Sequence, residues 1–313
     1  MRRVSGLRAL GLTAAMLFCC TCAASAIGAE PADKPVIAIT IDDLPVHGPL
    51  APGQTRLSIA HAIIAALKAE QVPATGFINA ASVESDPGSG AALHEWAAAG
   101  LQLGNHTWSH ARLDDLTSEA YGQEIMGDEA MLQRLSPKQD WHWFRYPYLA
   151  EGMDPEKRAA VRRILAERGY RIAAVTMDFG DWQFNTAYGR CAAKGDKKAM
   201  TKLEQQFLED ARISATYFRE MSQKLHGHDI PYVLLMHIGT MDAKLMPQLL
   251  AQYREMGFGF VSLEEAQRDP AYAADTDPSM AARPASPEGQ LAERGLSVPE
   301  PKRAGPHLDK VCT

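Results

Sequence analysis

The chain has 313 residues, of which 46% are hydrophobic and 22% are charged. This is the composition of an ordinary globular protein, and the length allows a large buried core in one large domain or two small ones. The formal net charge of −6 argues against non-specific binding to the phosphate backbone of a nucleic acid, so we expect no nucleic-acid partner.

The first 29 residues predict a secretory signal peptide. Arginines at positions 2, 3 and 8 precede an apolar stretch (residues 9–22), and Ala24-Ser25-Ala26 is an A-x-A cleavage site. An uncleaved membrane anchor is the alternative, although the apolar stretch is short for a bilayer span. Cleavage would remove three arginines and no acidic residue, which changes the net charge from −6 to −9. We therefore expect a periplasmic or secreted protein with no stable membrane insertion.

Apolar runs of strand length alternate with helical patterns along most of the chain. The strand-like runs are residues 36–41, 74–79, 101–106, 141–146, 170–179, 231–237 and 258–263. The helical patterns are residues 56–70, 91–100, 118–135, 155–169, 203–225 and 246–257. This alternation predicts a parallel sheet covered on both faces. We expect an α/β barrel, with an open doubly wound sheet as the alternative. A nucleotide-binding sheet is disfavoured because no glycine-rich phosphate loop follows the first strand.

The composition changes near residue 268, where Ala, Pro, Ser, Asp and Glu begin to dominate. We predict one domain over residues 30–269 and a flexible Pro/Ala-rich tail over residues 270–313. After signal cleavage the remaining cysteines are Cys191 and Cys312. In an oxidising compartment they either pair or stay free, and the sequence leaves both outcomes open.

Polar clusters follow five of the predicted strands. In a parallel α/β barrel the active-site residues lie at the carboxyl ends of the strands. Each cluster alone has an ordinary structural interpretation, but five at the same end of one sheet indicate a site. The first two offer three metal ligands and one spare carboxylate, which points to metal-assisted hydrolysis. The clusters are Asp42 and Asp43, His106 and His110, Arg145 and Tyr148, Asp178 and Asp181, and His237.

The same residues carry a family resemblance. The segments TIDD (residues 40–43), HTWSH (106–110), RYPY (145–148), DFGDW (178–182) and LLMH (234–237) resemble, in order and spacing, the five motifs of the polysaccharide deacetylases. These are the NodB-like domains of carbohydrate esterase family 4. The resemblance implies a distorted (β/α)7 barrel that removes N- or O-linked acetyl groups from a glycan. It also implies a divalent metal, usually Zn²⁺, with Co²⁺ or Ni²⁺ as alternatives.

The resemblance assigns roles to the individual residues. Asp43, His106 and His110 correspond to metal ligands, which leaves coordination positions open for water and substrate. Asp42 corresponds to the general base. Arg145 is expected to pair with Asp42, and the backbone N–H of Tyr148 is expected to stabilise the oxyanion. His237 corresponds to the general acid, oriented by Asp181. Trp182 and Leu235 are expected to form the walls of the acetyl pocket, and Pro147 is expected to bind substrate.

Two departures from the family pattern stand out, Ile41 where Phe is common and Ile238 where Asp often follows the histidine. Neither removes a catalytic role. His47, in the loop after Asp43, could line the cleft, but an exposed loop residue is the favoured interpretation. A non-catalytic glycan-binding relative and a hydrolase of C–N bonds in small non-sugar molecules are the alternative functions. The glycan and the oligomeric state are not identified by the sequence.

Overall fold

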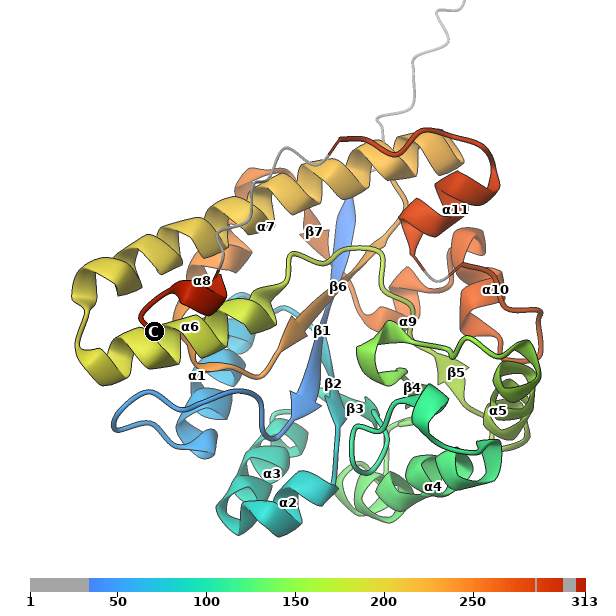
Figure 1. Cartoon of the computed structure of the whole chain (residues 1–313), viewed down its shortest axis with the longest axis horizontal. Helices are drawn as coiled ribbons and strands as arrows, with labels where there is room; N and C mark the ends of the chain where they lie inside the picture. The colour runs from blue at the N-terminus through green and yellow to red at the C-terminus, as the bar shows by residue number, and fades with distance from the viewer. Residues whose placement is uncertain (1–33, 285, 301–307) are drawn as a thin grey trace, which may run out of the picture. The chain divides into compact units, whose positions relative to one another are not determined.

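The computed structural model describes residues 34–284, 286–300 and 308–313 (Figure 1). The predicted signal peptide lies outside the described residues. Within these residues, seven strands form one sheet: β1 (Val36–Leu44), β2 (Ala74–Ile78), β3 (Gln102–Asn105), β4 (Trp143–Phe144), β5 (Arg171–Ile172), β6 (Tyr232–His237) and β7 (Gly259–Phe260). Between β1 and β5 lie α1 (Arg56–Ala69), α2 (Ala81–Ser85), α3 (Gly90–Ala98), α4 (Ser118–Leu135) and α5 (Pro155–Glu167). The later helices are α6 (Asp181–Lys194), α7 (Lys197–His226), α8 (Thr240–Glu255), α9 (Leu263–Ala266), α10 (Ala273–Thr276) and α11 (Pro287–Glu293).

Every pair of named strands in the sheet is parallel, as predicted. The strand order is β5-β4-β3-β2-β1-β6, and β7 pairs with β1. After β5 the chain reaches the opposite edge strand, where Met177 forms a parallel bridge with Leu234 of β6. The sheet therefore curls, with the segment after β5 contacting β6, and the prediction of a distorted (β/α)7 barrel is confirmed.

The apolar composition of the central strands explains why they lie in the middle of the barrel. Residues 37–42 of β1 and all five residues of β2 are buried. Helices cover the outside of the sheet, and their starts are fixed by side-chain caps such as Thr55 before α1 and Thr117 before α4. Because the strands are parallel, their carboxyl ends all lie at one end of the barrel, where the polar clusters also lie.

Two helices occupy the stretch between β5 and β6, where the sequence pattern indicated one. The predicted helix over residues 203–225 is the second part of α7, which spans 30 residues. The preceding stretch had no clear pattern in the sequence, yet it forms α6, which packs against α7 and α8 (Figure 1). The first residue of α6 is Asp181, so this helix holds one of the predicted site residues.

The prediction of a flexible tail over residues 270–313 is wrong for the described part of that stretch. It contains α10, α11 and two short 3-10 helices, η4 (Pro270–Tyr272) and η5 (Leu308–Lys310). Tyr272, Leu291 and Leu308 are buried. These apolar residues are single anchors separated by polar sequence, so they leave no periodic pattern to recognise.

A disulfide between Cys191 and Cys312 joins α6 to the C-terminal residues. Arg190 donates hydrogen bonds to the carbonyls of Val311 and Leu308, and Lys194 donates one to Thr313. The sequence left this pairing open. Within the described residues, no helix combines the length and the apolar character needed to cross a membrane.

Candidate metal and catalytic site

A bulge near the end of β1 brings Asp42 and Asp43 to the same end of the barrel. In a regular strand, consecutive side chains point to opposite faces. Here the register with β2 shifts between Ile41 and Leu44, and Asp43 has a positive φ of 62°. The bulge redirects the Asp43 side chain, so both carboxylates reach the histidines that follow β3.

Asp43, His106 and His110 form a cluster with the donor atoms of a metal site. The Oδ1 atom of Asp43 lies 3.5 Å from His106 Nε2 and 3.3 Å from His110 Nε2. Two ligand atoms of one tetrahedral zinc ion lie about 3.3 Å apart, because each is about 2.0–2.1 Å from the metal. Among the described residues, this buried Oδ1 atom has no hydrogen-bond partner. The three side chains therefore fit a divalent metal.

The surrounding groups keep these candidate ligands in the forms that bind a cation. His106 is buried, and its Nδ1 donates to the backbone carbonyl of Arg145 at 2.8 Å, which directs Nε2 toward Asp43. Burial lowers the pKa of His110 to about 4, so its imidazole is neutral at pH 7. Burial alone would raise the pKa of Asp43, but a hydrogen bond from His47 and the nearby imidazoles hold it well below its usual range.

Asp42 lies beside this cluster and is held by a buried arginine. Its Oδ1 accepts a hydrogen bond from Arg145 Nη1 at 2.9 Å, and its Oδ2 lies 3.6 Å from His106 Nε2. The same Nη1 donates to Thr40 Oγ1 at 2.7 Å, and other guanidinium nitrogens donate to the carbonyls of Ala173 and Ala174. Arg145 is fully buried, so the pair with Asp42 is protected from solvent screening.

His237, at the end of β6, forms a second charged pair with Asp181. Its Nδ1 lies 2.9 Å from Asp181 Oδ1, and its backbone N–H donates to Oδ2 at 2.6 Å. Burial by itself would lower the pKa of His237, but the charge and hydrogen bond of Asp181 outweigh it and raise the pKa to about 10. His237 is therefore an imidazolium at neutral pH.

Asp181 is supported by a buried polar chain that the sequence did not reveal. Asp242, in the first turn of α8, faces Asp181, and burial together with the charge of Asp181 raises the pKa of Asp242 well above its usual range. Asn185 of α6 donates to Asp242 Oδ2 at 2.6 Å and accepts from the backbone N–H of Met241. A Cβ at Gly239 would lie 1.9 Å from the Asn185 amide nitrogen, so this packing requires glycine there.

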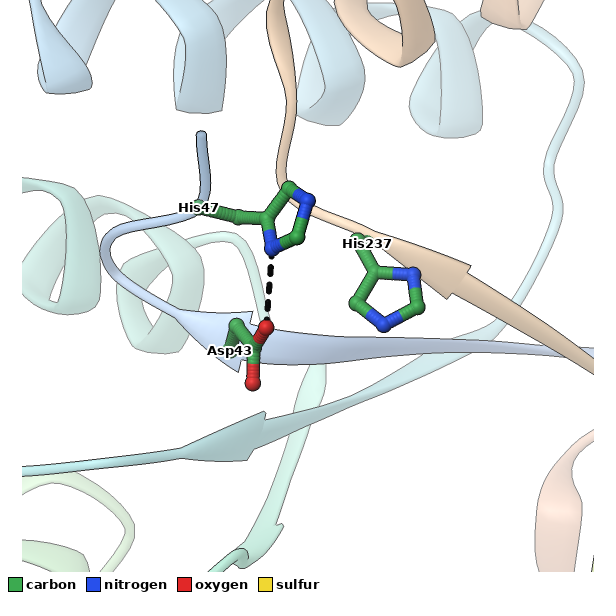
Figure 2. Close-up of side chains that lie close together, drawn as sticks. All are labelled: Asp43, His47 and His237. Atoms are coloured by element: carbon green, nitrogen blue, oxygen red, sulfur yellow. Dashed lines mark hydrogen bonds and ion pairs between the residues drawn. The ribbon is translucent and has the colours of Figure 1, made fainter. Parts of the chain in front are cut away.

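His47 belongs to the site, contrary to the interpretation of it as an exposed loop residue. Figure 2 shows Asp43, His47 and His237 pointing toward one another from β1, the loop after it and the end of β6. His47 Nδ1 lies 2.8 Å from Asp43 Oδ2, and its ring centroid is 4.7 Å from that of His237. Its spacing of four residues from Asp43 was the available signal, but the turn that folds the loop back cannot be read from spacing.

The remaining predicted site residues, Tyr148, Trp182, Leu235 and Pro147, differ in their exposure to solvent. Tyr148 has a positive φ of 60°, and its exposed ring lies 4.5 Å from the ring of His110. Trp182 follows Asp181 and is 48% exposed, whereas Leu235 and Pro147 are buried. Positive φ angles recur at Thr107, His110 and Leu149, as expected where a site stores backbone strain.

A cavity of about 410 Å³ lies beside the loop that carries Tyr148. Its walls include Tyr146, Leu149, the segment of residues 172–178 and part of the C-terminal stretch. Trp182, Leu235 and Pro147 do not line this cavity. Their assignment as substrate-binding residues stays a prediction.

Comparison with known proteins places this geometry in a family. Residues 29–187, just over half of the chain, match the family model described as polysaccharide deacetylase. The peptidoglycan-N-acetylglucosamine deacetylase PgdA of Listeria monocytogenes is 27% identical over 152 residues, which cover 48% of this chain. The match covers only 28% of that relative's length.

Solved structures agree with the barrel. The Xyl-CE4 domain of a multidomain xylanase from the hindgut metagenome of Trinervitermes trinervoides has a TM-score of 0.54 at 16% identity, covering 82% of this chain and 100% of that domain. A CE4 family pseudoenzyme from Bacillus anthracis has a TM-score of 0.53 at 17% identity, covering 75% and 66% of the two chains. At these identities the likeness concerns the fold. With the family match and the five motifs in place, the chain belongs to the polysaccharide deacetylases of carbohydrate esterase family 4.

Proposed function

We propose that this protein is an exported, metal-dependent hydrolase that removes acetyl groups from a glycan. The observation that carries the proposal is the presence of two side-chain pairs beside the candidate metal ligands. Asp42 is paired with Arg145, and His237 is paired with Asp181. A base and an acid flanking a metal are the groups that hydrolysis of an amide or ester requires.

Asp43, His106 and His110 would hold the metal. We favour Zn²⁺, because one carboxylate and two imidazoles are common zinc ligands, and Co²⁺ or Ni²⁺ are alternatives. When bound, the ion would lower the pKa of a water molecule and polarise the acetyl carbonyl. Asp42 accepts the proton of the attacking water, and the hydrogen bond from Arg145 keeps this carboxylate oriented. The backbone N–H of Tyr148 stabilises the negative charge that develops on the carbonyl oxygen.

His237 donates a proton to the leaving amine or alcohol. Its raised pKa, about 10, keeps the proton available at neutral pH, and Asp181 fixes the ring by accepting from Nδ1. The free Nε2 is then the atom that delivers the proton. Trp182 and Leu235 would enclose the acetyl methyl group, and Pro147 would contact the substrate.

The substrate class follows from the relatives and from the predicted export. PgdA is named as a peptidoglycan-N-acetylglucosamine deacetylase, and the predicted signal peptide would place this chain in the periplasm or outside the cell. We therefore propose an acetylated envelope or extracellular glycan as the substrate. A small non-sugar amide fits an exported enzyme less well.

A non-catalytic role is the second candidate, because solved structures of similar fold include a family pseudoenzyme. This chain keeps Asp42, His237 and the three candidate ligands, so the residues needed for catalysis are present. Binding of a glycan without acetate release, by metal-loaded protein, would favour this second candidate.

The test measures acetate release from chitin oligomers, peptidoglycan and acetylxylan by metal-free and zinc-loaded protein. We expect activity only after metal is added. Asp42→Asn should reduce turnover by about 10²–10⁴-fold while metal content stays normal, because the base is lost and the ligands are not. His110→Ala should lose the metal itself. Full activity of demetallated protein, or near-normal turnover of Asp42→Asn, would overturn the mechanism.

A further inference from the structure

The loop after β1 is folded back over the site and held there by several elements. Val46 donates its backbone N–H to the carbonyl of Asp43, which forms a tight turn. Arg56 of α1 donates to the carbonyls of His47 and Gly48 at 3.1 Å and 2.9 Å. Thr240 at the start of α8 donates to the carbonyl of Pro49. The position of His47 is therefore set by its surroundings and not by chance contact.

The two oxygens of Asp43 face different partners. Oδ1 faces His106 and His110, whereas Oδ2 accepts from His47 Nδ1. A carboxylate whose Oδ2 is engaged presents only Oδ1 to a cation. The side chain of His47 is 16% exposed, so little water competes for this hydrogen bond.

Asp43, His47 and His237 also have the spacing of a possible second metal site. The distances argue against that assignment. His47 Nδ1 and Asp43 Oδ2 are 2.8 Å apart, which is the length of a hydrogen bond and shorter than the separation of about 3.3 Å between two ligands of one zinc ion. The contacts of Asp43 to His106 and His110, at 3.5 Å and 3.3 Å, do match ligand spacing.

We propose that His47 is a positioning residue, which fixes Asp43 as a one-oxygen metal ligand through the Nδ1–H to Oδ2 hydrogen bond. The proposal rests on the proposed function only in its assignment of Asp43, His106 and His110 to the metal. His47 acts as the outer partner of a ligand, in the way that carboxylates orient ligating histidines in other metal sites. Its ring also packs against His237, so one side chain adjoins both the ligand and the proposed acid.

Three variants of the full chain separate the effect of the His47 hydrogen bond from the effect of its ring packing. His47→Phe keeps the ring packing and loses the donor, His47→Ala loses both, and His47→Asn returns a donor near the position of Nδ1. We expect the zinc dissociation constant, measured by competition with a chromophoric chelator, to rise about 10–100-fold in the Phe and Ala variants. The Asn variant should recover most of the affinity. If His47 had only a structural role, the zinc dissociation constant would not depend on whether residue 47 carries a hydrogen-bond donor.

The matched control is His142→Ala. His142 Nδ1 also lies 2.8 Å from a carboxylate, that of Asp140, but this pair is at the surface and away from the candidate ligands. The zinc affinity of the His142→Ala variant should equal that of the unmodified protein. The unmodified protein should bind one equivalent of zinc.

The outcomes separate this inference from the proposed function. Unchanged zinc affinity of His47→Phe would overturn the positioning role, even in a protein that releases acetate. If the unmodified protein bound two equivalents of zinc and His47→Ala bound one, His47 would be a ligand of a second ion. This result would also overturn the positioning role. One equivalent, with weakened binding in the Phe variant but no acetate release from any glycan, would support the inference while contradicting the proposed function.

Discussion

His237 titrates very differently in this site than a histidine does in water. It ends β6 with Nδ1 against the buried Asp181 carboxylate, and its pKa is raised to about 10. The raised pKa also affects stability. The contribution of the pair is fully present below the ordinary histidine value of about 6.5, and it is lost as the pH rises from there through about 10.

Asp181→Asn tests whether the Asp181 carboxylate raises the pKa of His237. Removing the negative charge leaves burial as the main influence, so the pKa of His237 should fall to or below about 6.5. The stability loss between pH 6.5 and 10 should then become smaller. NMR titration of the His237 ring in metal-free protein measures the shift. Asp140→Asn, next to the surface residue His142, is the control and should leave His237 unchanged. A pKa still near 10 in Asp181→Asn would refute the assignment.

At the scale of elements, the site depends on where α6 and α8 begin. Asp181 opens α6, and Asp242 lies in the first turn of α8, so the two helix starts bring two buried carboxyl groups together. One of them must keep its proton, because two buried carboxylates in contact cannot both be ionised. The raised pKa identifies Asp242 as the protonated partner, which donates to Asp181.

Asp242→Asn and Asp242→Ala should have opposite effects. A carboxyl group with a raised pKa stabilises the fold fully below about pH 3.8, and this contribution is lost as the pH rises above that value. Asn resembles the protonated acid, so Asp242→Asn should match or exceed the stability of the unmodified protein at pH 8. Asp242→Ala leaves the side-chain N–H of Asn185 without its acceptor and should cost about 1–3 kcal/mol. Urea unfolding at pH 5 and pH 8 provides the measurement. A large loss in the Asn variant at pH 8 would mean that Asp242 is ionised.

The elements that could be predicted are those with a simple period. The helix expected over residues 118–135 has those bounds in α4, and the apolar run at residues 36–41 begins β1. Helix α6 was missed because its buried residues include Asn185, Tyr188 and Gly189, which do not form an apolar stripe. The bulge at Asp43 was also not predictable, since regular alternation would place Asp42 and Asp43 on opposite faces. The site was predicted from motif order, whereas His47 and Asp242 needed the folded chain.

At the scale of the whole molecule, the C-terminal stretch is part of the domain and not an appendage. Tyr272 donates to the carbonyl of Pro231, just before β6, and Arg162 of α5 donates to the carbonyls of Ala274 and Asp277. The disulfide between Cys191 and Cys312 spans 121 residues and connects this stretch to α6. Because α6 begins at Asp181, the covalent link stabilises the helix that supports the proposed acid.

Replacing both cysteines by serine should lower the stability of the domain by about 2–4 kcal/mol, since the long loop is no longer closed in the unfolded chain. The denaturation midpoint in urea, compared with and without a reducing agent, measures the effect. The unmodified protein should respond to reduction, and the double serine variant should not. Equal midpoints for the oxidised protein and the double variant would show that the disulfide contributes nothing to folding.

The contact between Gly239 and Asn185 has an evolutionary consequence. A side chain at position 239 would displace Asn185, and the effect would pass through Asp242 to Asp181. Substitutions at these positions should therefore be correlated among natural homologues. Homologues with glycine at the position of Gly239 should carry an amide side chain at the position of Asn185. Homologues in which this glycine is replaced should have a residue smaller than asparagine at the position of Asn185. This covariation would separate a subgroup of deacetylases by sequence alone.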